Sequence, residues 1–160
     1  MPLYFAYGSN IDAAAMARRC PRSAAIGPAR LVRHRLAAMR EGWLTVMRDP
    51  RQSVQGVLWN LALADMPALD RYEGVASGLY RKALQSVATE SGAKRALVYF
   101  GANAGPGVAP PEYIAAIIAA ARQWSLPVAA LEAFLPGGAG ATDAPKAIRA
   151  RRRFATPLEG

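Results

Sequence analysis

The chain opens on an apolar segment and then changes to a helical pattern. Residues 2–7 predict a strand, and the glycine-containing turn Tyr7-Gly8-Ser9-Asn10 follows it. The run Ile11–Arg18 has the character of a short helix, which ends before Pro21. A strand, a tight turn and a helix start are therefore expected within the first twenty residues.

The middle of the chain reads as strands. Candidates are Ala29–Ala38, Trp43–Arg48 and Val54–Leu61, separated by the turn-forming pairs Glu41-Gly42 and Asp49-Pro50. We expect these strands to be antiparallel neighbours. A further hairpin is predicted from Leu79–Thr89 and Lys94–Phe100, because both arms carry β-formers and the connector Glu90-Ser91-Gly92 carries a glycine.

Helical signals lie before that hairpin and near the end of the chain. Asp65 is placed to cap a short helix that runs through Leu69 and Tyr72 to Gly74. The helices expected after the Gly- and Pro-rich loop are Glu112–Trp124 and Val128–Phe134. One early helix, mostly antiparallel strands and terminal helices make an α+β pattern rather than alternating βα units.

Composition sets the size and charge of the fold. With 160 residues, of which 52% are hydrophobic, the chain fits one compact domain, which we place at residues 1–140 with a basic tail at 141–160. The formal charge of +9 suggests nucleic acid, but much of it lies in that tail and in one early segment, Arg30–Arg40. We favour a solvated tail over a nucleic-acid-binding arm.

The expected location is cytoplasmic. The longest apolar helical run, Ile114–Ala121, is too short to cross a bilayer, and Met1–Tyr4 has no basic region of a secretory signal. Cys20 is the single cysteine, which agrees with a reducing compartment. No heptad pattern indicates an oligomeric state.

The turn Tyr7-Gly8-Ser9-Asn10 is the first candidate for a functional site. A turn between a strand and a helix start leaves backbone N–H groups unpaired and pointing one way, so it suits an anion or an oxyanion. Alone, it would equally support a phosphate site. Ser9 and Asn10 also have a structural alternative as helix N-caps.

Histidine and cysteine chemistry is poorly supported. His34, the single histidine, lies between two arginines, which disfavours an imidazolium, and one histidine excludes a multi-histidine metal site. A packed or surface role is expected for it. Cys20 has no nearby base in the sequence and reads as a small buried hydrophobe.

Among the acidic residues, Glu73 is the candidate base. Asp12 belongs in a first helical turn, and Asp65 and Glu112 suit helix starts. Glu73 instead comes at a helix end beside Tyr72, where its negative charge opposes the helix dipole. We therefore expect a raised proton affinity, as a general base near neutral pH needs, although an exposed helix-end glutamate is the alternative.

The chain carries several separate blocks in this order: Leu3–Asn10, Gln55–Trp59, Leu69–Val75, Gly78-Leu79-Tyr80, Pro110–Tyr113 and Leu126-Pro127. In order and spacing, these blocks resemble the γ-glutamylcyclotransferases, a family with an AIG2-like fold. The resemblance reaches about residue 135 and therefore covers most of the domain. A four-residue pattern alone would be weak evidence, but several blocks in order are specific.

The resemblance implies a small mixed, mostly antiparallel β-barrel flanked by helices. It also implies a cofactor-independent cyclisation, in which a γ-glutamyl substrate attacks its own γ-carbonyl and yields 5-oxoproline plus an amino acid or amine. Glu73 matches the family's base, and no metal is required. The positions matching the family's substrate pocket are Tyr7, Gly8, Ser9, Asn10, Tyr80 and Tyr113.

Three alternatives remain open. The substrate could be a γ-glutamylamine or glutathione, although Asn10 and the block Arg71–Gly74 look more like the branch that acts on γ-glutamyl amino acids. The protein could be a relative that kept the pocket only to bind a small ligand. It could also be a basic protein that binds nucleic acid, which a salt-sensitive gel shift without cyclising activity would favour.

Overall fold

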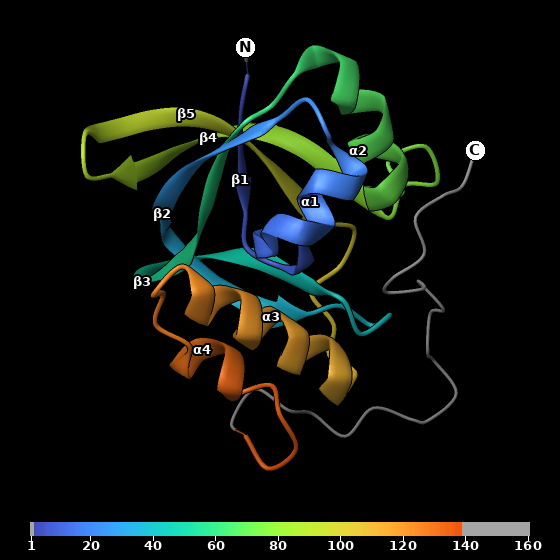
Figure 1. Cartoon of the computed structure of the whole chain (residues 1–160). Coiled ribbons are helices and arrows are strands. Elements are labelled where there is room, and N and C mark those ends of the chain that lie inside the picture. Colours follow the sequence, from blue (N-terminus) through green and yellow to red (C-terminus); the bar gives the residue numbers. More distant parts are fainter. Residues whose placement is uncertain (1, 139–160) are drawn as a thin grey trace.

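The strands of this chain close into a β-barrel in the order β1-β3-β2-β4-β5 (Figure 1). The structure, a computed structural model, describes residues 2–138, so the predicted tail 141–160 lies outside it. All neighbouring strands are antiparallel except β1 and β5, which pair in parallel at Tyr4 and Leu97. The strands are β1 (Leu3–Ala6), β2 (Ala24–Ala38), β3 (Leu44–Asn60), β4 (Tyr80–Thr89) and β5 (Gly92–Gly101).

Helices flank the barrel, which confirms the predicted α+β class. In Figure 1, α3 and α4 lie side by side along one side of the barrel, away from α2. Ile114, Ile117 and Ala121 of α3 are buried, as expected for one face of an amphipathic helix. The helices are η1 (Ser9–Ile11), α1 (Ala13–Arg19), η2 (Leu63–Asp65), α2 (Met66–Glu73), α3 (Pro111–Gln123) and α4 (Ala129–Glu132).

A close contact between β1 and β3 positions the turn that follows β1. A Cβ atom at Gly56 would lie 2.2 Å from the carbonyl oxygen of Ala6 and 2.6 Å from the Phe5 ring. Only glycine leaves room for this approach. Phe5 is fully buried and Ala6, the residue before the turn, is 1% exposed, so the end of β1 is held in the core.

Two strands predicted at Trp43–Arg48 and Val54–Leu61 are in fact the single strand β3. The expected turn at Asp49-Pro50 is instead an irregularity within the β2–β3 pairing, whose register shifts between Val32 and His34. The proline has no N–H for the ladder, so the interruption falls there. Pairing with β2 on both sides keeps the chain extended where the local signal favoured a reversal.

Two aspartates have other roles than predicted. Asp65 does not cap α2 through its side chain; its carboxylate accepts hydrogen bonds from the Arg22 N–H at 2.9 Å and the Ser23 hydroxyl at 2.8 Å. Asp12 is not inside the first turn but is the N-cap of α1, accepting from the Ala14 N–H at 2.9 Å. This also removes the N-cap alternative for Ser9 and Asn10 at α1.

The remaining predictions for β4, β5 and α3 agree closely with the structure. The hairpin turns through Glu90 and Ser91, with Thr89 opposite Gly92. Gly92 has a φ of +102°, a conformation that favours glycine. Cys20 is buried, and so is His34, which is 3% exposed.

Candidate active site

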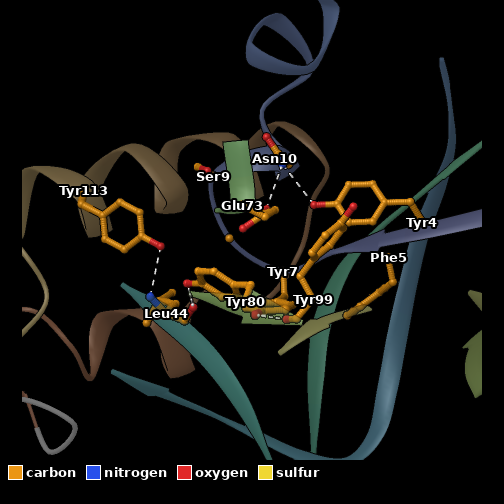
Figure 2. Close-up of a pocket in the computed structure, with 11 residues that line it drawn as sticks. Tyr4, Phe5, Tyr7, Ser9, Asn10, Leu44, Glu73, Tyr80, Tyr99 and Tyr113 are labelled. Carbon is orange, nitrogen blue, oxygen red and sulfur yellow. Dashed lines mark hydrogen bonds between the residues drawn. The ribbon is translucent and has the colours of Figure 1, made fainter. Parts of the chain in front are cut away.

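The residues predicted for the site all line one pocket between the first turn, the end of α2 and the barrel (Figure 2). Its empty volume, mouth included, is about 340 Å³. The predicted residues that line it are Tyr7, Gly8, Ser9, Asn10, Glu73, Tyr80 and Tyr113.

The turn after β1 becomes the short helix η1. Its first backbone hydrogen bond runs from the Ile11 N–H to the Gly8 carbonyl at 3.0 Å. The N–H groups of Gly8, Ser9 and Asn10 precede that bond and have no acceptor within η1. The turn therefore places these three N–H groups at the start of η1, where no carbonyl of that helix accepts from them.

Glu73 is the last residue of α2 and points into the pocket. Gly74 ends the helix in the left-handed conformation, with a φ of +66°, and its N–H bonds back to the carbonyl of Arg71. The side chain of Glu73 is buried, since the residue is only 7% exposed. The exposed helix-end alternative is therefore wrong.

Glu73 meets the turn through Asn10, which lies 63 positions earlier in the chain. The Asn10 Nδ2 atom is 3.5 Å from Oε1 of Glu73 and 3.1 Å from the Tyr4 hydroxyl. Both residues are buried, and Figure 2 shows the carboxylate beneath the amide. The fold thus brings a carboxylate and a set of backbone donors into one small space.

The predicted tyrosines form the opposite side of the pocket. Tyr80 donates its hydroxyl to the Leu44 carbonyl at 2.6 Å, and the Tyr113 hydroxyl accepts from the Leu44 N–H at 3.2 Å. The Tyr7 hydroxyl donates to the carbonyl of Tyr99. These bonds fix the backbone of the wall, while the rings face the pocket.

Sequence reasoning missed other lining residues, namely Tyr4, Phe5, Leu44 and Tyr99. Tyr4 had a signal, because it shares the block Leu3–Asn10 with the turn. Tyr99 had none, because it reaches the pocket only when β5 closes the barrel against β1. Its hydroxyl donates to Oδ1 of Asp70 at 2.6 Å.

The phenols of Tyr4 and Tyr99 resist ionisation. Burial, and then the nearby charge of Glu73, raises the pKa of Tyr4 well above its usual value. Burial and the hydrogen bond to Asp70 raise the pKa of Tyr99 in the same direction. Both hydroxyls are therefore neutral at physiological pH.

Other chemistries find little support in the described part of the chain. Within residues 2–138, no three His, Cys, Asp or Glu side chains group as a metal site would require. His34 lies outside the pocket, where its Nδ1 is 2.8 Å from the carbonyl oxygen of Val32. No helix among these residues is long and apolar enough to span a bilayer.

Comparison with known proteins agrees with the geometry. The profile of the family described as gamma-glutamyl cyclotransferase, AIG2-like, matches residues 4–125. Human gamma-glutamylcyclotransferase is 31% identical over 137 residues, which cover 79% of this chain and 73% of the human protein. The mouse protein of the same name is 31% identical over 136 residues, covering 78% and 72%.

Solved structures give the same result. One described as gamma-glutamyl cyclotransferase superposes with a TM-score of 0.77 at 26% identity, covering 94% of each chain. A human protein described as uncharacterized superposes with a TM-score of 0.75 at 30% identity, covering 81% of this chain and 83% of that one. Because the family profile matches residues 4–125 and the human relative is 31% identical, this chain belongs to the AIG2-like gamma-glutamyl cyclotransferase family.

Proposed function

We propose that this protein is a γ-glutamylcyclotransferase, which converts γ-glutamyl amino acids or amines to 5-oxoproline and a free amino acid or amine. The observation that carries the proposal is the approach of the buried Glu73 carboxylate to the turn Tyr7–Asn10. Family membership supports it. The reaction proposed needs no cofactor, and its setting is the cytoplasm.

Glu73 acts as the general base and then as the acid. It takes the proton that the substrate's neutral α-amino group loses as it attacks the γ-carbonyl carbon. The new C–N bond closes a five-membered ring, and the carbonyl oxygen becomes an oxyanion. When the old amide C–N bond breaks, the proton passes from Glu73 to the leaving nitrogen. A positioned base of this kind is worth roughly 10²–10⁴-fold in rate.

In this proposal the turn holds the negative charges of the substrate. The N–H groups at the start of η1 are the donors we assign to the oxyanion and to the substrate's α-carboxylate. Losing one oxyanion donor typically costs about 3 kcal/mol of transition-state stabilisation. Backbone groups supply these bonds, so replacing the Ser9 side chain leaves them in place. We therefore expect replacement of Ser9 to lower activity less than replacement of Glu73.

The tyrosines on the other side of the pocket favour a bent conformation of the substrate. A γ-glutamyl chain is extended in water and must bend before its amine reaches its own carbonyl. The rings of Tyr7, Tyr80 and Tyr113 narrow the pocket and favour the bent form. Correct orientation of the reacting atoms can supply roughly 7–11 kcal/mol of the barrier reduction.

The direct test is release of 5-oxoproline from γ-glutamyl-alanine by the purified protein without added metal. We expect release by the wild type, almost none by Glu73→Gln, and wild-type rates from Glu90→Gln. Glu90 is a matched control, since it is exposed in the β4–β5 turn. Wild-type turnover in Glu73→Gln would overturn the mechanism. Parallel assays with glutathione and a γ-glutamylamine identify the leaving group.

A further inference from the structure

Arg19, the last residue of α1, lies outside the pocket but contacts a residue on its polar side. Its guanidinium donates a hydrogen bond to Oδ1 of Asn10. The Cζ atom also lies 3.6 Å from the centroid of the Tyr72 ring, which is a cation–π contact. Arg19 is half-buried and does not itself line the pocket.

The chemistry of the guanidinium decides how the Asn10 amide is turned. A guanidinium has only donors, so the atom of Asn10 that faces it must be the carbonyl oxygen. The NH₂ group is then on the other side, facing Tyr4 at 3.1 Å and Glu73 at 3.5 Å. Both amide hydrogens thus have acceptors, and one of these is the proposed base.

We propose that Arg19 is a positioning residue, which holds the Asn10 amide with its N–H groups toward Glu73 and so keeps the carboxylate in place for proton transfer. The inference rests on the proposed function. The inference assigns a role in the proposed reaction to a residue that does not line the pocket.

A second contact strengthens the role of Arg19. Tyr72, on which the guanidinium stacks, precedes Glu73 on α2, and its hydroxyl is 2.6 Å from the Ser9 hydroxyl. Arg19 therefore touches α2 and connects to the turn by two routes. Removing its side chain therefore loosens both α2 and the turn, which bear the proposed catalytic groups.

The expected consequence concerns the charge of Glu73. Without Arg19, nothing forces the amide oxygen outward, and Oδ1 can turn toward the carboxylate. Two acceptors in contact favour the protonated acid. The titratable groups that feel the charge of Glu73 include the hydroxyls of Tyr4 on β1 and Tyr99 on β5, whose raised pKa values keep them neutral.

The test compares Arg19→Met with Arg18→Met, which removes the same charge from the exposed neighbour on α1. We expect Arg19→Met to lower kcat at least about tenfold, a part of what a positioned base contributes, with little change in KM. The acidic limb of its pH profile moves to higher pH. Arg18→Met changes neither quantity, and Arg19→Lys, which keeps the positive charge and the ability to donate but not the planar fork, partly restores both.

A second readout does not depend on turnover. We expect the ¹³C NMR titration of the Glu73 carboxyl to move to higher pH in Arg19→Met, with thermal melting showing that the variant is folded. An unmoved titration in Arg19→Met, or equal shifts in both arginine variants, overturns the positioning role. Absence of 5-oxoproline release by the wild type would contradict the proposed function separately, since this titration still reports on Arg19.

Discussion

The two sides of the pocket are built differently. On one side, which we call the turn wall (Ser9, Asn10 and Glu73), side chains bond to other side chains, and Asn10 contacts Glu73, Tyr4 and Arg19. On the other, which we call the barrel wall (Tyr7, Tyr80 and Tyr113), hydroxyl groups bond to backbone atoms.

The difference indicates a division of labour. A network of side chains around a buried carboxylate can change protonation and respond to substitution at any member. Hydroxyls bonded to the backbone instead fix the shape of a wall. Their loss is expected to lower the free energy of unfolding rather than the rate. We therefore assign proton transfer to the turn wall and substrate folding to the barrel wall.

Apart from replacement of Glu73 itself, the largest effect is expected from Asn10→Asp, which places a second carboxylate beside Glu73. Two carboxylates at this distance favour sharing one proton. Glu73 is then already protonated at neutral pH and cannot take a proton from the substrate. We expect kcat to fall about 100-fold, within the range for loss of a general base. Steady-state kinetics across pH check this, with activity recovering as pH rises.

Asn103→Asp is the matched control for that substitution. Asn103 donates to the carboxylate of Glu41 at 2.9 Å, so the variant creates a similar pair of acids outside the pocket. It should keep wild-type kcat. An equal loss of kcat in both variants would mean that charge anywhere on the fold, rather than charge at Glu73, controls the rate.

A smaller effect is expected from Tyr80→Phe on the barrel wall. The change removes the hydrogen bond to the Leu44 carbonyl, which is buried. We expect the free energy of unfolding to fall by about 1–2 kcal/mol, measured by chemical denaturation, while kcat changes little. A large fall in kcat at unchanged stability would move the Tyr80 hydroxyl into the chemistry and erase the distinction between the walls.

The smallest effect is expected from thiol reagents. Burial, with the nearby charge of Asp65, raises the pKa of Cys20 to about 12. The thiolate is the reactive form, so it is scarce in the folded protein at pH 8. Iodoacetamide should leave activity unchanged and label Cys20 only after denaturation, as mass spectrometry can show. Rapid labelling of the active protein would contradict the burial of this side chain.

Local patterns predicted much of the fold. The β4–β5 hairpin and α3 follow from β-formers around a glycine turn and from apolar spacing, which act over a few residues. The Asp49-Pro50 pair shows where this fails. The local sequence predicts a turn there, but pairing with β2 keeps both flanking segments in one strand. A short window of sequence does not contain the residues of β2.

The site could be predicted only in part for the same reason. The turn Tyr7–Asn10 is local and was found from its own residues, whereas Glu73 was singled out with the help of the family resemblance. Tyr99 and Leu44 line the pocket because the barrel closes and brings distant strands together. Contacts between distant elements leave no mark in the local pattern.

The central claim is that Glu73 moves the proton while the turn and the tyrosines hold the substrate. Binding and turnover of γ-glutamyl-alanine, measured together on wild type and Glu73→Gln, test it most directly. We predict that calorimetry detects nearly unchanged substrate binding to the folded variant, while 5-oxoproline release falls by at least about 100-fold. Wild-type release by Glu73→Gln, or loss of binding and turnover together, would contradict the account.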